Sequence, residues 1–291
     1  MKTILLGANG QLGTDLQQAV NDRETAVSLV PLFRSDLDVS NVDAIADELA
    51  SRDFDALINC TSYHKTDEVE TNATQGFTIN AHAVQALANV CRDKNAKFVH
   101  ISTDYVFDGT AASPLTEADA PGPINVYGAS KFMGERLASL AHPDGTYILR
   151  VASLFGIAGA SGKGGNFVET MIKVGRDRGE LKVVDDVTMS PTATADIALM
   201  ILALLEKNAP AGIYHGVNSG QATWYEFASQ IISRAGVDAT VAPCTSDEFP
   251  TKALRPAYSV LDNSKLTSVM GTIPTWQDAL DRYLAAKGHT G

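Results

Sequence analysis

Two polar side chains four positions apart could carry acid–base chemistry in this sequence. Tyr127 and Lys131 occur in the segment NVYGASKFMGE, and on a helix this spacing places both side chains on one face. The pKa of a tyrosine phenol is about 10, too high for a catalyst at neutral pH, but a neighbouring ammonium group stabilises the phenolate and lowers that pKa. We therefore expect Tyr127 to donate a proton to a developing alkoxide, with Lys131 as its partner.

A second polar pair, Thr103 and Asp104, directly follows the apolar run FVHIS. Ligands of an open parallel sheet bind beyond the carboxyl ends of its strands, which places this pair near the reacting end of a cofactor. The Thr103 hydroxyl could bond a substrate carbonyl and, together with Tyr127, stabilise the charge that develops on its oxygen. An isolated Thr-Asp pair could instead form a turn or cap. Its combination with Tyr127 and Lys131 favours the catalytic interpretation.

A glycine-rich loop lies between the first expected strand and the first expected helix. It reads Gly7-Ala-Asn-Gly10-Gln-Leu-Gly13. Glycines there permit a tight turn and close approach of the backbone to a pyrophosphate, and the helix N-terminus offers free N–H groups. Because the loop follows a strand and opens a helix, it indicates a dinucleotide site rather than an ordinary turn.

The residues after the second expected strand bear on the choice of dinucleotide. That strand ends in Arg34-Ser35, where NAD-selective enzymes place an acidic residue for the ribose 2′-hydroxyl. A guanidinium suits a 2′-phosphate, so Arg34 favours NADPH. Asp36 and Asp38 follow closely and could bind the hydroxyl instead, which keeps NADH as the alternative and a solvated Arg34 as the other interpretation.

Strands alternating with helices are expected to position these groups. The expected strands are Thr3 to Leu6, Val27 to Phe33, Ala56 to Cys60, Lys97 to Ser102 and Tyr147 to Val151, and the expected helices are Gly13 to Val20, Val42 to Ser51, Thr74 to Lys94 and Tyr127 to Ala141. Such alternation implies parallel pairing through right-handed crossovers. It predicts an α/β fold, a Rossmann-type doubly wound parallel sheet.

The pattern loosens after Val151, where the glycine-rich stretch GIAGASGKGGN is followed by an amphipathic run from Thr223 to Ala235. We expect an NADP(H)-binding domain over residues 1–155 and a smaller α/β substrate-binding portion over residues 156–291. A strand and helix near residues 181–205 could return to the first sheet.

Composition excludes several classes of protein. The 291 residues are 45% hydrophobic and carry a net charge of -11 without a basic run, so a nucleic-acid partner is not expected. No apolar stretch reaches the roughly 18 residues that span a bilayer, and the first residues do not resemble a secretory signal. Three widely separated cysteines indicate neither a disulfide framework nor a metal motif. We expect a cytoplasmic protein.

Six segments together resemble the dTDP-4-dehydrorhamnose reductase family of extended short-chain dehydrogenase/reductases. They are GANGQLG, NCTSYHKTDEVE, STDYVFDG, NVYGASKFMGE, LRVASLFG and RPAYSVLDNSKL, and they span nearly the whole chain. The resemblance implies NADPH-dependent reduction of the 4-keto group of a nucleotide-linked deoxyhexose, with dTDP-4-dehydro-L-rhamnose as the favoured substrate in dTDP-rhamnose biosynthesis. A homodimer is a further expectation.

The resemblance also implies roles for single residues. Thr103, Tyr127 and Lys131 occupy the catalytic positions, and Asp104 occupies a substrate-binding position. Residues 9–12 would hold the pyrophosphate, residues 38–39 would lie beside the adenosine and residues 62–64 would line the cofactor. The expected cofactor contacts are thus Gly7, Asn9, Gly10, Gln11, Leu12, Gly13, Arg34, Asp38, Val39, Ser62, Tyr63, His64, Tyr127 and Lys131.

Two departures from the family pattern concern the sugar. Where the family commonly reads LRTSWVYG this chain reads LRVASLFG, so Ser153 replaces a tryptophan that packs on the sugar, and Phe155 is expected to help form the substrate site. Thr66 replaces a common valine. Some family members have been described as Mg²⁺-dependent through acidic residues at a dimer interface, but those acids are not identified in this sequence, so the metal stays open.

Two other functions share this fold and cofactor site. One is a non-catalytic NADP-binding subunit resembling the β subunit of methionine adenosyltransferase, against which Thr103, Tyr127 and Lys131 argue. The other is a sugar-nucleotide epimerase or dehydratase, which would retain its NAD through the catalytic cycle.

Overall fold

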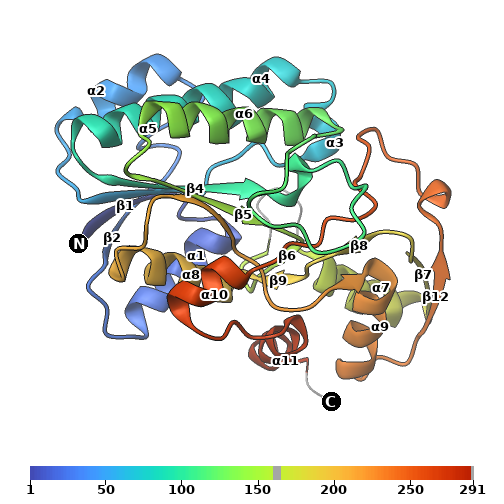
Figure 1. Cartoon of the computed structure of the whole chain (residues 1–291). Helices are drawn as coiled ribbons and strands as arrows, with labels where there is room; N and C mark the ends of the chain where they lie inside the picture. Colours follow the sequence, from blue (N-terminus) through green and yellow to red (C-terminus); the bar gives the residue numbers. More distant parts are fainter. Residues whose placement is uncertain (160–164, 290–291) are drawn as a thin grey trace.

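A six-stranded parallel sheet forms the centre of the protein in the computed structural model, which describes residues 1–159 and 165–289. The strand order is β10-β5-β4-β3-β1-β2. These strands are β1 (Lys2–Leu6), β2 (Ser28–Leu32), β3 (Ala56–Asn59), β4 (Lys97–Thr103), β5 (Thr146–Val151) and β10 (Gly212–His215). The reversal of strand order beside β1, with helices on both faces (Figure 1), confirms the predicted Rossmann-type fold.

Two apolar layers bury the faces of this sheet. One layer packs side chains of β1, β3 and β4, such as Leu57 and Phe98, against α2 (Ile45–Ala50), α5 (Ala83–Asp93) and α6 (Val126–Ala141). The other packs Leu5, Ile58 and Leu149 against α1 (Gln11–Asn21), α8 (Thr194–Glu206) and α10 (Ser264–Met270). Figure 1 shows these two sets of helices on opposite sides of the sheet. Strands that are mostly apolar on both faces are typical of a sheet covered on both sides.

The remaining elements build a smaller lobe and the connections. The helices are α3 (Thr66–Val69), α4 (Ala73–Phe77), α7 (Phe167–Arg178), α9 (Trp224–Arg234) and α11 (Trp276–Ala286); the strands are β6 (Leu154–Phe155), β7 (Glu180–Val184), β8 (Thr188–Met189), β9 (Thr192–Ala193), β11 (Ala222–Thr223) and β12 (Thr240–Cys244). A π-helical turn, Thr78–His82, joins α4 to α5, so the helix expected over residues 74–94 is interrupted.

The chain returns to the large sheet after the expected boundary at residue 155. Helix α8 packs on the sheet and β10 then pairs with β5, with His215 opposite Arg150. The strand of the 181–205 unit does not join the large sheet, because β7 pairs with β12 in the smaller lobe. The returning unit is therefore α8 with β10, and residues 156–291 are divided between the large sheet and the smaller lobe.

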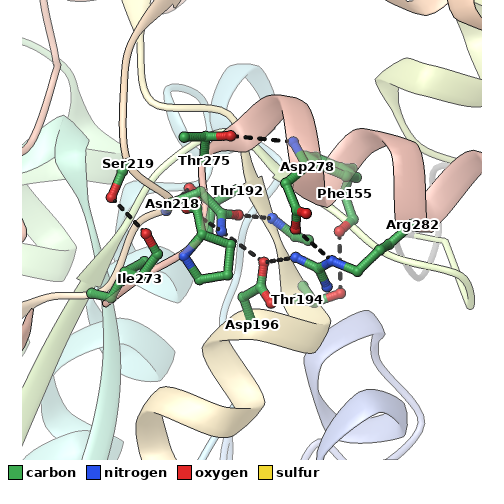
Figure 2. A network of polar contacts seen from close by, with 12 residues as sticks. Phe155, Thr192, Thr194, Asp196, Asn218, Ser219, Ile273, Thr275, Asp278 and Arg282 are labelled. Atoms are coloured by element: carbon green, nitrogen blue, oxygen red, sulfur yellow. Dashed lines mark hydrogen bonds and ion pairs between the residues drawn. The ribbon is translucent and has the colours of Figure 1, made fainter. Parts of the chain in front are cut away.

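A polar network fastens the C-terminal helix to the start of α8 (Figure 2). Arg282 Nη2 on α11 donates to Asp196 Oδ2 at 2.8 Å, and Asn218 Nδ2 donates to the same oxygen at 2.6 Å. Asn218 Oδ1 accepts from the Ala193 backbone N–H at 2.9 Å. Asp196 lies in the first turn of α8, where its charge also complements the helix dipole. The network thus ties the smaller lobe to a helix that covers the large sheet.

Candidate active site

The glycine loop has the close backbone packing expected for it. Gly7 has a φ of +74°, and a Cβ at this position would lie 3.0 Å from the Cys60 carbonyl carbon. A Cβ at Gly13 would lie 2.3 Å from the Gly7 oxygen. Both positions therefore require glycine, one for its backbone conformation and the other for the approach of α1 to the loop.

The N-terminus of α1 fits an anionic group such as a pyrophosphate. Helix α1 begins after Gly10 with no side-chain cap and no acidic residue in its first turn. Gln11 Oε1 is buried without a hydrogen-bond partner in the described part of the chain. Unpaired N–H groups and the helix dipole make such an end an anion site. The loop therefore fits a dinucleotide on its own geometry.

Other predicted cofactor contacts differ in exposure. The side chains of Leu12 and Val39 lie in the apolar layers, so only their backbone can face a ligand. Arg34 is 78% exposed and its Nε donates to Asp38 Oδ2 at 3.0 Å. Asp38 Oδ1 also accepts from the Ser40 backbone N–H and hydroxyl. The structure thus presents an exposed guanidinium that is paired with Asp38, the carboxylate that could bind the ribose hydroxyl instead.

The loop after β3 lies between the glycine loop and Tyr127. Because β3 lies between β1 and β4, its carboxyl end adjoins both the glycine loop and Thr103. Ser62 hydrogen-bonds the Tyr127 hydroxyl and also donates to Asn80 Oδ1 at 3.1 Å. The Tyr63 backbone N–H donates to the same Asn80 oxygen at 2.9 Å. Asn80, which the sequence analysis missed, thus holds the loop that carries Ser62, Tyr63 and His64.

Thr103, Asp104 and Tyr127 meet at the carboxyl end of β4. The Thr103 hydroxyl donates to Asp104 Oδ1 at 3.0 Å and is also hydrogen-bonded to the Tyr127 side chain. Ser259, from the C-terminal part of the chain, bonds the Asp104 carboxylate. Burial raises the pKa of Asp104 to about 6, against the lowering effect of these hydroxyls. The site therefore brings the hydroxyl groups of Thr103, Tyr127 and Ser259 together with one carboxylate.

The pKa of Tyr127 shifts in the direction opposite to our expectation. Burial and the nearby Asp104 charge raise it to about 12, although hydrogen bonding between Tyr127 and the Thr103 and Ser62 side chains acts to lower it. Lys131 does not offset this shift, because its amine donates to the Ile101 carbonyl at 2.5 Å and lies 3.3 Å from His100 Nε2. The pKa of Tyr127 is therefore raised, and not lowered as its four-residue spacing from Lys131 had led us to expect. Tyr127 is instead a fully protonated acid.

The two residues expected at the sugar lie in different surroundings. Ser153 is half-buried, with a φ of +45° in the left-handed region. Phe155 is 1% exposed and its ring packs against Phe227 and Tyr283, with centroid distances of 5.6 and 5.5 Å. The Phe155 ring thus belongs to the core of the smaller lobe. This packing argues against the expected sugar contact of Phe155, while Ser153 stays a candidate.

Membrane and metal features can be assessed for residues 1–159 and 165–289. None of the helices there has the length and apolarity to cross a bilayer. The same residues contain no group of three or more His, Cys, Asp or Glu side chains arranged to hold a metal ion.

Comparison with known proteins places the chain in a family. The family model described as RmlD substrate binding domain matches residues 1–288. The chain belongs to this family. It is 36% identical to a dTDP-4-dehydrorhamnose reductase of Streptomyces griseus over 99% of this chain and 95% of the relative.

Solved structures of the same family superpose closely on this chain. A dTDP-4-dehydrorhamnose reductase from Clostridium acetobutylicum has a TM-score of 0.92 and 36% identity, covering 99% of this chain and 100% of that protein. The Bacillus anthracis enzyme, crystallised in complex with NADP, has a TM-score of 0.90 and 35% identity, covering 98% and 99%. The family resemblance inferred from the sequence motifs is therefore confirmed.

Proposed function

We propose that this protein is an NADPH-dependent reductase of the 4-keto group of a dTDP-linked 6-deoxyhexose, with dTDP-4-dehydro-L-rhamnose as substrate and dTDP-L-rhamnose as product. The observation that carries the proposal is the meeting of Thr103, Asp104 and Tyr127 beside a glycine loop shaped for a dinucleotide. The activity named for the S. griseus relative and the NADP complex of the B. anthracis enzyme support it.

Bound NADPH would supply a hydride to the keto carbon, and residues of this chain would handle the oxygen. The hydroxyls of Thr103 and Tyr127 are close enough to bond each other, so one substrate oxygen can lie within reach of both. Thr103 would donate to that oxygen in place of its present bond to Asp104 Oδ1. As negative charge develops there, two positioned donors stabilise it. Tyr127 then transfers its proton to that oxygen, and the ammonium form of Lys131 would stabilise the phenolate that remains.

Residues around this centre would hold the two ligands. Gly7, Gly13 and the N-terminus of α1 would receive the pyrophosphate, and Arg34 would bind the 2′-phosphate. Asp104 and Ser153 would contact sugar hydroxyls. A homodimer and a cytoplasmic location complete the proposal, and the net charge of -11 argues against a nucleic-acid partner.

The deciding experiment measures NADPH oxidation by purified protein with dTDP-4-dehydro-L-rhamnose and identifies the product. A parallel panel of other nucleotide 4-keto sugars, each with NADPH and NADH, tests substrate and cofactor choice. We expect stoichiometric NADPH consumption and dTDP-L-rhamnose. Absence of reduction, with co-purification of a methionine adenosyltransferase, would support the regulatory alternative. NAD that stays bound through turnover would support an epimerase or dehydratase.

A further inference from the structure

A chain of buried hydrogen bonds reaches Lys131 from the side of the sheet. Asn59 Nδ2 at the end of β3 lies 3.3 Å from His100 Nδ1 in β4, and His100 Nε2 lies 3.3 Å from Lys131 Nζ on α6. These three side chains are at most 1% exposed. Solvent therefore cannot replace these contacts, and each polar atom must find a partner of the right kind inside the protein.

Thr61 fixes the orientation of the Asn59 amide. Asn59 Oδ1 accepts from the Thr61 backbone N–H at 3.0 Å and from the Thr61 hydroxyl at 2.5 Å. A backbone N–H can only donate, so the amide oxygen must face Thr61. The amide NH₂ of Asn59 consequently faces His100 and donates to it.

The orientation of Asn59 determines the tautomer of His100. Burial, together with the charge of Lys131, lowers the pKa of His100 well below its ordinary value, so its ring is neutral. A neutral imidazole has one N–H donor and one acceptor nitrogen. Because Nδ1 accepts from Asn59, the proton must be on Nε2. That proton points at the amine of Lys131.

We propose that Thr61, Asn59 and His100 form a positioning relay that disfavours the ammonium form of Lys131. An ammonium group has three donors and no lone pair, so it opposes the N–H of His100, whereas a neutral amine accepts from it. The neutral amine can still donate to the Ile101 carbonyl. The relay thus makes Lys131 a weaker base than it would be if a hydrogen-bond acceptor faced its amine.

The other ionisable groups around Lys131 only partly counter the relay. Glu135, on the same helix, favours the ammonium form, but its carboxylate is already paired with Arg150. Cys60, beyond β3, stays a neutral thiol because burial raises its pKa to about 12. Burial of Lys131 itself lowers its pKa to about 8, with the Glu135 carboxylate acting in the opposite direction. The relay therefore acts in the same direction as burial.

The tautomer can be measured directly in the ligand-free protein. Long-range ¹H–¹⁵N correlation spectra of protein labelled with ¹⁵N-histidine distinguish protonated from bare ring nitrogens, and loss of one set of signals in His100→Gln assigns His100 among the six histidines. We expect a protonated Nε2 and a bare Nδ1 at neutral and mildly alkaline pH. A protonated Nδ1, alone or together with Nε2, would overturn the proposal.

Asn59→Asp should reverse the relay with little change in shape. One carboxylate oxygen would keep the Thr61 bonds and the other would accept from His100 Nδ1, so that Nε2 offers its lone pair to Lys131. We expect the reversed tautomer in the spectra. The alkaline limb of the kcat/KM profile should also move upward by about one pH unit or more. This kinetic arm rests on the proposed function, because it assumes that the ammonium form of Lys131 is the active one.

Asn80→Asp is the matched control. Asn80 is also 1% exposed and near the site, but its side chain hydrogen-bonds residues 62–63 and Ser130 rather than His100. The His100 tautomer should be unchanged in this variant, and a reversal would contradict the relay, as would an unchanged tautomer in Asn59→Asp. If Asn59→Asp does not fold, the tautomer of the parent protein still decides. A parent protein without reductase activity would count against the proposed function alone.

Discussion

Glu135 and Arg150 form a two-pronged ion pair inside the protein. Arg150 Nε donates to Oε1 of Glu135 at 3.0 Å and Nη2 donates to Oε2 at 2.7 Å, with both side chains 1% exposed. The Ser102 hydroxyl donates to the same carboxylate at 2.5 Å. Glu135 lies one helical turn after Lys131 on α6, and Arg150 lies on β5. The pair therefore fixes the catalytic helix against the sheet.

We expect Glu135→Gln to lower the free energy of unfolding by about 3 to 5 kcal/mol, because it leaves the Arg150 charge buried without a counter-ion. Denaturant unfolding of the parent and the variant measures this difference. Glu248→Gln is the control, since it breaks an ion pair with Lys182 that is exposed on both sides and should change little. Equal losses in the two variants would show that the buried pair has no special weight.

Tyr127→Phe and Lys131→Ala should each reduce turnover by roughly 100-fold or more, because a positioned acid–base group contributes that much. Steady-state kinetics with the keto sugar and saturating NADPH measure the loss. Tyr225→Phe removes a phenol from α9 in the smaller lobe and should leave turnover unchanged. Near-parental turnover in folded Tyr127→Phe and Lys131→Ala would show that the catalytic set is wrongly assigned.

Arg34→Ala should raise the KM for NADPH more than the KM for NADH, because only NADPH has a 2′-phosphate for the guanidinium to bind. The exposed position of Arg34 leaves it free to reorient from Asp38 towards a ligand. Arg178→Ala, at the end of α7, is a control for general loss of positive charge. Equal effects of Arg34→Ala on the two cofactors would show that Arg34 does not distinguish them.

Asp104 should make the folded protein less stable as pH rises from about 4 to about 6. Its pKa is raised by burial from an ordinary value of 3.8 to about 6, so the folded state holds a proton that the unfolded state has already lost. The stabilisation is complete below the unfolded pKa and is lost as pH passes the folded pKa. A shift of this size corresponds to about 3 kcal/mol.

Comparison with Asp104→Asn isolates this contribution. From about pH 4 to about pH 6 the parent should lose unfolding free energy relative to the variant. Above about pH 6 the difference between the two proteins should stay constant. A pH-independent difference would mean that Asp104 titrates normally.

The large sheet was predictable up to β5 because each strand is a short apolar run separated from the next by a helical segment. Strand β10, with the sequence GIYH, was not, since it has no distinctive pattern and its partner β5 is remote in the sequence. The sequence LKVV reads as the stronger strand, but β7 pairs with β12 in the smaller lobe. Which strand joins the large sheet therefore depends on pairing between distant segments, which a local sequence pattern does not show.

The predicted site shows the same division. Thr103, Tyr127 and the glycine loop were found from local spacing. Asn59 and His100 were missed. Their contacts with each other and with Lys131 depend on β3 and β4 lying side by side and on α6 packing against them. A polar residue within the apolar runs ALINC and FVHIS was the available signal, and it indicated only a buried group that needs a partner.

Phe155 illustrates why the sugar contacts were harder to predict, and it gives the last prediction. We expected neighbours two apart on a strand to share a face, but β6 has only two residues and Ser153 precedes it with a positive φ. The Phe155 ring instead packs against Phe227 and Tyr283. Phe155→Ala should therefore lower the free energy of unfolding by about 3 to 5 kcal/mol, the usual loss for a large core side chain.

The KM for the keto sugar separates this structural role from a binding role. In Phe155→Ala protein that is still folded at the assay temperature, the KM should stay near the parental value, whereas Ser153→Trp should change it because the half-buried Ser153 is the remaining candidate for sugar contact. An aromatic contact is worth about 0.5 to 1.5 kcal/mol beyond its buried area, which corresponds to a KM change of roughly 2-fold to 13-fold. Parental stability with a raised KM in Phe155→Ala would return Phe155 to the sugar site. An unchanged KM in Ser153→Trp would remove Ser153 from it.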